Sequence, residues 1–369
     1  MINLESFRRV KGKKYYPEID GLRFVAIMPV VIAHYVVSIA RNGVYDLPEK
    51  DIHGLLFFRL IDSGVFGVFL FFGISGFIVA LPFFKAMQRE GNVHIKTYFM
   101  RRVSRIEPPY IIAMTVLFLA QLLMNMPDVG LKNYLVSLLY MHGIVYGNYS
   151  PVNPVAWSLE IEVQFYLLLP LLFYFLIRIK SILMVLVLLA AVLLCVSVGV
   201  KLYQHNLHLS FLRMGHYFIA GIVIAYLHVF KPATFRISNT LATLLFILSM
   251  LGFVFGQLYW DSFIYHLQLI SVFLAIYAAM AGRTVKKILS TPFIAIVGGM
   301  CYTIYLYHFA MLHIVTKVLL SVYSTQIWWA DFLLYSLVAL IVVLVTSSIL
   351  FKLFEKPFMR HDWYKRARG

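Results

Sequence analysis

The first long apolar stretch of the chain reads Ile19-Asp-Gly-Leu-Arg-Phe-Val-Ala-Ile-Met-Pro-Val-Val-Ile-Ala-His34. It has the composition of a membrane-spanning helix, yet it holds a cation, Arg23, and a titratable imidazole, His34. At about 100° and about 1.5 Å per helical residue, His34 lies within about 20° of the face of Arg23 and about 16 Å further along the axis. Ionisable groups inside a membrane span usually face a bundle interior or a watery cavity. The pair therefore predicts a functional stripe at two depths.

The whole chain has the composition of a membrane protein. Of its 369 residues 62% are hydrophobic and 13% charged, with a mean hydropathy of +0.84, whereas a soluble domain has about 25% charged residues. Apolar runs long enough to cross about 30 Å of hydrocarbon recur along it. We expect an all-α, polytopic integral membrane protein with about ten transmembrane helices. The expected spans are 19–39, 64–82, 108–126, 155–177, 181–200, 211–230, 240–258, 263–281, 292–320 and 331–353.

The Lys and Arg residues between these spans predict the orientation. Alternate flanks, starting with the N-terminus and including 83–107, hold 24 of the 32 basic residues, and the other flanks hold seven. Because positive flanks are retained in the cytoplasm, both termini should be cytoplasmic. We expect a basic N-terminus over 1–18, one transmembrane domain over 19–353 whose first helix is not cleaved, and a basic tail over 354–369. The longest connections should be an inner loop, 83–107, and an outer segment, 127–154.

Charge and cysteine content exclude other classes. The net charge of +16 follows from this sidedness, so we expect no nucleic-acid partner. Cys195 and Cys301 both fall within predicted spans and do not indicate an extracellular disulfide framework. We expect no metal site.

Three arginines precede the third expected span. Arg102 and Arg105 are three residues apart and project from one face of a helix, with Arg101 beside them. Two guanidinium groups on one face suit a phosphate ligand, because each presents planar bidentate donors. Ordinary positive flanking with lipid headgroup contact is the alternative.

Two glutamates begin the fourth expected span, within Asn153-Pro-Val-Ala-Trp-Ser-Leu-Glu160-Ile-Glu162-Val-Gln-Phe-Tyr166. They lie about 200° apart on a helix and cannot serve one site together, whereas Glu162 and Tyr166 share a face. We expect Glu162 to be the deeper, buried carboxylate and Glu160 to lie at the membrane interface. A purely structural role for Glu162 is the alternative.

Two further segments carry small or polar residues. Glycines along Gly64-Val-Phe-Gly67-Val-Phe-Leu-Phe-Phe-Gly73-Ile-Ser-Gly76 predict close helix packing in the second span. Tyr305 and His308 share one face of the ninth span. A buried histidine is often a satisfied structural partner, so a structural role for His308 is the alternative to a catalytic one.

Taken together and in order, these segments resemble the integral membrane acyltransferase family 3, whose bacterial members O-acylate cell-surface and secreted glycans and, in some cases, small secondary metabolites. The resemblance implies that Arg23 and His34 are the paired first-helix motif, that Arg102 and Arg105 form the Arg-x-x-Arg motif, and that Glu162 is the glutamate of span four. It also rests on Gly67-Val-Phe-Leu-Phe-Phe-Gly-Ile-Ser-Gly-Phe77, Tyr302-Thr-Ile-Tyr-Leu-Tyr-His308 and Phe354-Glu-Lys-Pro357.

The resemblance implies a membrane O-acyltransferase, with acetyl the commonest group. We expect cytoplasmic acyl-CoA to place its phosphates on Arg101, Arg102 and Arg105, with Arg23 slightly deeper. Neutral His34 would deprotonate an acceptor hydroxyl, since an imidazole pKa of about 6.5 suits a general base, and Glu162 would orient that imidazole or the acceptor. Direct transfer and a transient acyl-histidine both fit. Further candidates for supporting roles are Asp20, Ser75, Asn153, Trp157, Tyr166, Tyr305 and His308.

The expected setting is the bacterial cytoplasmic (inner) membrane. The donor is a substrate, and we expect no tightly bound cofactor. The acceptor would be a hydroxyl of a carbohydrate, such as a cell-surface polysaccharide, an exopolysaccharide or a lipid-linked glycan, and polysaccharide-assembly proteins are candidate partners. Some family members add a soluble domain after the last span; here we expect the membrane domain, or a separate protein, to complete transfer. The alternative is an exporter of glycans or lipid-linked intermediates, which would also bury polar groups at mid-membrane.

Overall fold

The structure is a computed structural model that describes residues 16–43, 63–91, 93–127, 129–176, 209–258 and 262–359, together with Val187, Ala191 and Leu194. Within these residues it consists of helices and connections, without strands, which confirms the all-α prediction. The longer helices are α1 (Pro17–Asn42), α4 (Gly67–Gln88), α5 (Ile95–Leu123), α8 (Trp157–Leu176), α10 (Phe211–Phe230), α11 (Asn239–Leu258), α12 (Ser262–Ala281), α15 (Cys301–Val322) and α16 (Trp328–Leu350). The shorter ones are η2 (Ser63–Phe66), α6 (Leu131–Leu138), α7 (His142–Tyr146), η3 (Pro154–Ala156), η5 (Pro232–Phe235), α13 (Arg283–Leu289), α14 (Pro292–Gly299), the π-helical turn η6 (Phe351–Glu355) and η7 (Lys356–Met359).

The helices have the lengths of membrane spans. Eight helices in the described ranges are long and apolar enough to cross a membrane, and the pair α12 and α13, bent by 96°, makes a ninth. Most of the expected spans agree with the observed helices to within a few residues. The fifth expected span, 181–200, lies outside the described residues apart from Val187, Ala191 and Leu194. The chain is a multi-pass membrane protein.

Two connections contain more helix than the sequence predicted. The connection expected over 83–107 is only a short turn in the structure, because α4 continues to Gln88 and α5 begins at Ile95. The arginines of this region therefore lie on a formed helix, which Lys and Arg favour where it extends past the apolar layer. The expected outer segment 127–154 contains α6 and α7.

The ninth expected span, 292–320, is broken into α14 and α15 at Met300. The break brings α14 against α1: a Cβ atom at Gly298 would lie 1.7 Å from the carbonyl oxygen of Asp20. The new start of α15 is capped by Glu355, whose Oε2 accepts hydrogen bonds from the backbone N–H (3.1 Å) and the hydroxyl (2.5 Å) of Thr303. Glycine thus permits the close approach, and a carboxylate satisfies donors that a helix start leaves free.

Helix α1 lies at the centre of the bundle, in contact with α4, α12, α14, α15 and α16. Helix α4 also packs along α10, where a Cβ atom at Gly221 would lie 1.9 Å from the carbonyl oxygen of Gly73. The glycines predicted to serve helix packing in the second span therefore do so.

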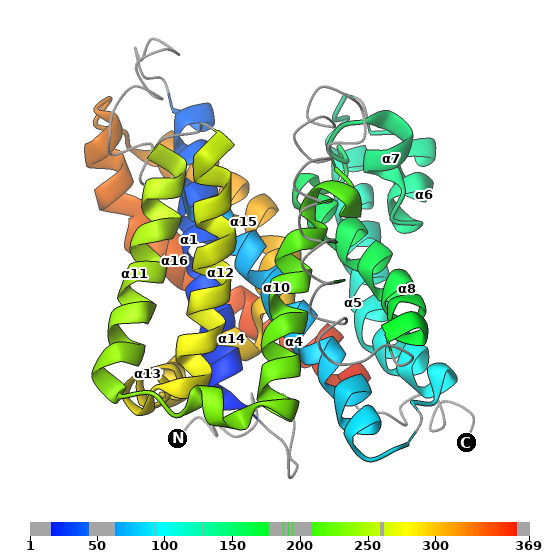
Figure 1. Ribbon diagram of the computed structural model, residues 1–369. Helices are drawn as coiled ribbons and strands as arrows, with labels where there is room; N and C mark the ends of the chain where they lie inside the picture. The colour runs from blue at the N-terminus through cyan, green and yellow to red at the C-terminus, as the bar shows by residue number, and fades with distance from the viewer. Residues whose placement is uncertain are drawn as a thin grey trace.

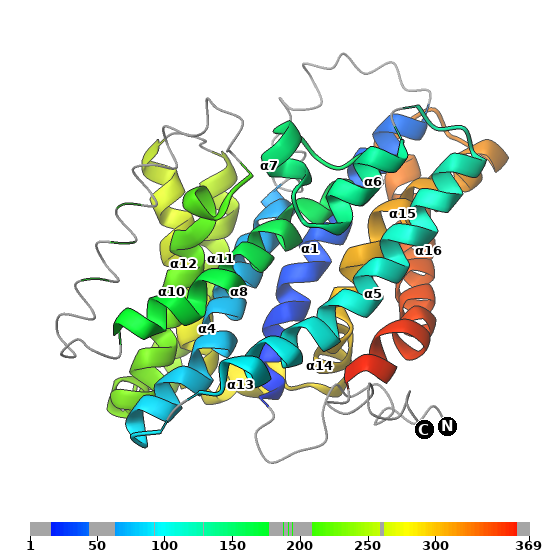
Figure 2. The same ribbon diagram turned by 90° about the vertical axis from the view of Figure 1, so that its right-hand side faces the viewer.

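The two ends of the bundle differ (Figures 1 and 2). The start of α1, the turn between α4 and α5, η5, α13 and η6 lie at one end. We call it the basic end because Lys and Arg residues lie in or next to the last four of these segments. Helices α6 and α7 lie at the opposite end, which we call the cap end. The described connections that the sequence assigns to the cytoplasmic side lie at the basic end. The orientation of the termini and the side that this end faces stay predictions.

Candidate active site

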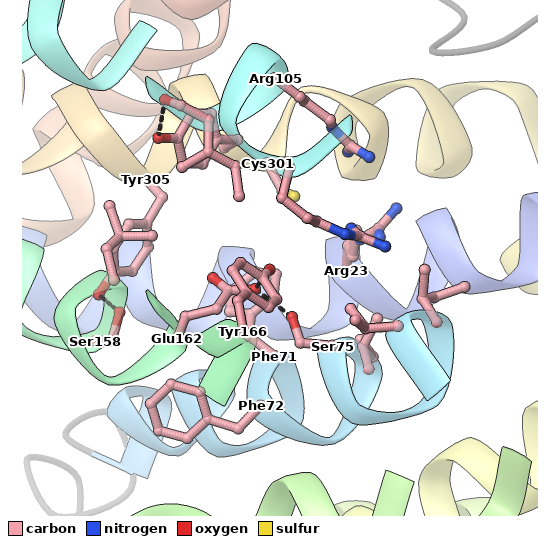
Figure 3. Close-up of a pocket in the computed structure, with 17 residues that line it drawn as sticks. Arg23, Phe71, Phe72, Ser75, Arg105, Ser158, Glu162, Tyr166, Cys301 and Tyr305 are labelled. Carbon is pink, nitrogen blue, oxygen red and sulfur yellow. Dashed lines mark hydrogen bonds between the residues drawn. The ribbon is translucent and has the colours of Figure 1, made fainter. Parts of the chain in front are cut away.

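A cavity of about 800 Å³, part of it open to the surroundings, lies among α1, α4, α5, α8 and α15. Its lining combines apolar side chains with a few charged and hydroxyl groups, as the lining of a small-molecule or cofactor site does. Figure 3 shows Arg23 and Arg105 at one end of it and Tyr305 with Ser158 at the other, with Glu162 and its neighbours between them. Its polar lining consists of Arg23, Ser75, Arg102, Arg105, Ser158, Glu162, Tyr166, Cys301, Tyr302 and Tyr305.

The end of the cavity nearer the start of α1 carries three guanidinium groups. Arg23 is ion-paired with Asp20, one turn earlier on α1, and only 14% of its side chain is exposed. The guanidinium carbon of Arg102 lies 5.6 Å from the centre of the Tyr166 ring. In the part of the chain that the structure describes, neither Arg102 nor Arg105 has a carboxylate within salt-bridge distance. Both are therefore available to an anionic ligand.

Glu162 occupies the middle of the cavity. Its Oε1 accepts hydrogen bonds from the hydroxyl groups of Ser75, on α4, and Tyr166, one turn further along α8. These two donors fix the carboxylate facing the cavity (Figure 3). No hydrogen bond joins Glu162 to His34 among the described residues, so the structure does not support the expectation that Glu162 orients the imidazole.

The far end is built where the start of α8 meets α15. The Tyr305 hydroxyl donates to the carbonyl of Val155 (2.7 Å), so the hydroxyl of Ser158, also 2.7 Å away, donates to Tyr305 in turn. The Asn153 amide donates to the carbonyl of Leu306 (3.0 Å). The Trp157 ring packs edge-on against Phe72. The hydrogen bonds join the start of α8 and the residues before it to α15, and the Trp157 ring joins α8 to α4.

Two histidines lie behind Tyr305. The Nδ1 atom of His34 is 2.9 Å from Nε2 of His308, and the His308 ring centre is 5.8 Å from that of Tyr305. His308 is fully buried, whereas His34 is half-buried and packs edge-on against Phe309. His34 does not line the cavity. The sequence-predicted site is thus divided into a cavity group and a histidine pair, joined through α15.

The sequence matches a known protein family and several known proteins. The model of a family described as an acyltransferase domain matches residues 16–348. The chain belongs to this family. A peptidoglycan O-acetyltransferase, OatA of Listeria monocytogenes, is 24% identical over 97% of the chain and 58% of its own length. The O-acetyltransferase OatA of Staphylococcus aureus is 23% identical over 84% of the chain and 53% of its own length. The chain spans about half the length of the curated relatives it matches. No solved structure matches it significantly.

Most residues proposed from the sequence lie in or beside the cavity. Arg101 is the exception among the arginines, because it is exposed and does not line the cavity. Those in the lining are Arg23, Ser75, Arg102, Arg105, Glu162, Tyr166 and Tyr305; those in contact with lining residues or their helices are Asp20, Asn153, Trp157 and His308.

The expectation for Glu160 is wrong. Glu160 is the more buried of the two glutamates, at 1% exposed, whereas Glu162 is only partly buried. The Oε2 atom of Glu160 accepts a hydrogen bond from the backbone N–H of Gly143 (2.8 Å). Helix α7 folds back onto the start of α8 and covers this carboxylate. Burial also lowers the pKa of the neighbouring His142 imidazole, which favours its neutral form.

Three polar residues of the cavity lining, Ser158, Cys301 and Tyr302, are not among the candidates proposed from the sequence. Ser158 and Tyr302 stand inside the quoted motifs, next to residues that were chosen. Cys301 carried no signal, because it reaches the cavity only through the break at Met300. The tail residue Glu355, which caps α15, was quoted as part of a motif without a role.

Proposed function

We propose that this acyltransferase transfers an acetyl group from acetyl-CoA, bound at the arginine end of the cavity, to a hydroxyl of a carbohydrate that reaches the histidine pair from the cap end. The observation that carries the proposal is that the two ends of the cavity present different chemical groups. Guanidinium groups without described carboxylate partners lie at one end, and hydroxyl groups backed by two imidazoles lie at the other.

The donor suits the arginine end because coenzyme A carries several phosphate charges. Arg102 and Arg105 come from one face of α5 and Arg23 from α1, so an anion between them receives donors from two helices. Their distance from the far end lets the pantetheine arm extend past Glu162. The thioester would then lie near Tyr305, beside the histidines.

The reaction is an acyl transfer with His34 as general base. The acceptor oxygen attacks the thioester carbon, a C–O bond forms, and the C–S bond breaks. The hydroxyl proton passes to His34 and then to the sulfur of the departing coenzyme A, so no net proton is released. A transient acyl-histidine on the same nitrogen is the second route that this arrangement permits. Glu162 lies along the path of the pantetheine arm in this proposal.

The acceptor class rests on the relatives. Two of them are named O-acetyltransferases, one for peptidoglycan, and a cell-surface glycan made at the bacterial cytoplasmic membrane would meet the cap end if the basic end faces the cytoplasm. Polysaccharide-assembly proteins are the partners that would bring such a glycan. Lipid surrounds the bundle, and no tightly bound cofactor is needed.

The direct test uses purified full-length protein in nanodiscs, acetyl-CoA labelled in the acetyl group, and N-acetylglucosamine oligomers or extracted surface glycans as acceptors. We expect label in an alkali-labile ester together with one free thiol released for each ester formed. His34→Ala should lower the rate about 10²- to 10⁴-fold while the protein remains inserted and monodisperse. Full activity of His34→Ala would remove the proposed base.

Two further experiments separate transfer from export. Mass spectrometry of surface glycans from cells with and without the gene should show a difference of one acetyl group. Glycan movement across vesicles without any chemical change would instead support a transporter and contradict the proposal.

A further inference from the structure

We propose that His308 is a positioning residue that holds His34 in the neutral tautomer whose Nε2 atom carries the lone pair. The inference rests on the proposed role of His34 and names the group that makes this role possible. It assigns to the buried member of the histidine pair a function in the reaction rather than in packing.

The argument begins at two backbone carbonyls. Nδ1 of His308 lies 3.0 Å from the carbonyl oxygen of Ile304 and 2.9 Å from that of Tyr305. A carbonyl oxygen can only accept a hydrogen bond, so Nδ1 of His308 must carry the proton. In a neutral imidazole the other nitrogen then has the lone pair.

The tautomer of His308 determines the tautomer of His34. Because Nε2 of His308 is an acceptor, Nδ1 of His34, at 2.9 Å, must donate to it. Neutral His34 therefore has its proton on Nδ1 and its lone pair on Nε2. A general base needs a free lone pair, and this hydrogen-bond chain places it on the nitrogen that points away from the partner ring.

Burial favours the neutral form of the orienting ring. His308 is 0% exposed, and no carboxylate lies within salt-bridge distance of either imidazole among the residues that the structure describes. A charged imidazolium without such a partner is costly to bury. The orienting group is thus a second neutral imidazole, where many catalytic histidines have a carboxylate.

The pair also accommodates the charge that forms during the reaction. When Nε2 of His34 takes the hydroxyl proton, its Nδ1–H bond to His308 becomes charge-assisted and stronger. The Nδ1–H of His308 remains bonded to the two carbonyls, which polarises the chain in the same direction. The proton then leaves Nε2 for the thiolate sulfur as the C–S bond breaks, and both rings return to the neutral state.

A polar seam joins α1 and α15 beyond the histidine pair. One turn beyond the pair, the hydroxyl groups of Ser38 and Thr316 lie 2.6 Å apart. A further turn along α1, the Asn42 amide donates to the hydroxyl of Thr316 (2.9 Å). The seam supplies a control, because it joins the same two helices without contacting the histidines.

The test compares His308→Gln with His308→Leu in the nanodisc assay with acetyl-CoA and N-acetylglucosamine oligomers. The glutamine amide can accept from Nδ1 of His34 and donate to the carbonyls, whereas leucine fills the space and can do neither. We expect His308→Leu to lower kcat about 10²- to 10⁴-fold with the KM for acetyl-CoA unchanged within about twofold. The kcat of His308→Gln should be at least about tenfold higher than that of His308→Leu.

Thr316→Val serves as the matched control and should keep kcat within about threefold of the parent. Wild-type kcat in His308→Leu, equal losses in both His308 variants, or an equal loss in Thr316→Val would each overturn the positioning role. The activity of His34→Ala distinguishes failure of the proposed function from failure of this inference. If that variant is active the proposed function fails, whereas an inactive His34→Ala beside a fully active His308→Leu contradicts this inference alone.

Discussion

Arg102 and Arg105 differ from Arg101 in what their side chains face, although all three lie within two turns of α5. The first two line the cavity, and Arg101 is exposed. Their shared feature in the sequence, a run of positive charge, does not distinguish a ligand site from membrane flanking. The position of the cavity favours the ligand site for Arg102 and Arg105.

Replacing Arg102 or Arg105 with alanine should raise the KM for acetyl-CoA roughly 10- to 100-fold, because a charge-assisted hydrogen bond contributes about 1.5–3 kcal/mol. The kcat at saturating donor should change much less. Arg101→Ala is the control and should stay within about twofold of the parent. Initial-rate measurements over a range of acetyl-CoA concentrations check this, and an effect confined to acceptor kinetics would contradict a donor site on α5.

Residues that share a helical face could be placed from the sequence, and residues paired across the fold could not. The spacing of Glu162 and Tyr166 correctly predicted one face of α8. The contact of His34 with His308 joins positions 274 residues apart, for which the sequence holds no spacing rule. The burial of Glu160 depends in the same way on α7 returning over it.

Helices α4 and α10 pack closely at positions where one or both of them carry glycine. The backbone at Gly221 faces the carbonyl of Gly73, and that at Gly76 faces the carbonyl of Phe218. Apolar surface gains little by leaving lipid, so dispersion contacts between closely packed helices stabilise this pair. Side chains at the glycine positions would prevent such close packing. The pair also supports Ser75 and Phe72, which line the cavity from α4.

Gly221→Ala should force α4 and α10 apart and cost about 1–3 kcal/mol through overpacking. The expected result is a lower thermal unfolding midpoint and a lower yield of monodisperse protein in detergent. Gly130→Ala is the matched control, since a Cβ atom there meets nothing within 4 Å. A midpoint for Gly221→Ala equal to that of Gly130→Ala would show that the close approach does not matter for stability.

Apolar length predicted the helices well where the helix and the apolar run coincide, as in α10 and α11. It failed where a helix extends into polar sequence, so α5 begins at Ile95 rather than at 108. It also failed at Met300, because the apolar run continues without interruption through the break between α14 and α15. Breaks of this kind depend on close packing against another helix, here α1.

At the scale of the whole molecule, the basic connections of the described chain gather at one end, away from α6 and α7. Single-cysteine variants test which side this end faces, in a background lacking Cys195 and Cys301. With a membrane-impermeant maleimide, Tyr149→Cys near the cap end should react in intact cells, because Tyr149 is 54% exposed. Lys287→Cys on α13, also exposed, should react only after the membrane is opened. The reverse pattern would invert the predicted topology and separate the arginines from cytoplasmic donor.

The polar seam has a consequence for biogenesis. A ribosome adding about 5–20 residues per second reaches His308 roughly 15–55 s after His34, since 274 residues separate them. Until then His34 and Ser38 lack the partners that they have on α15. Arg23 is different, because its ion pair with Asp20 lies within α1 and forms as soon as that helix does. The nascent first helix therefore enters the membrane with Arg23 already ion-paired, and its imidazole meets His308 only near the end of translation.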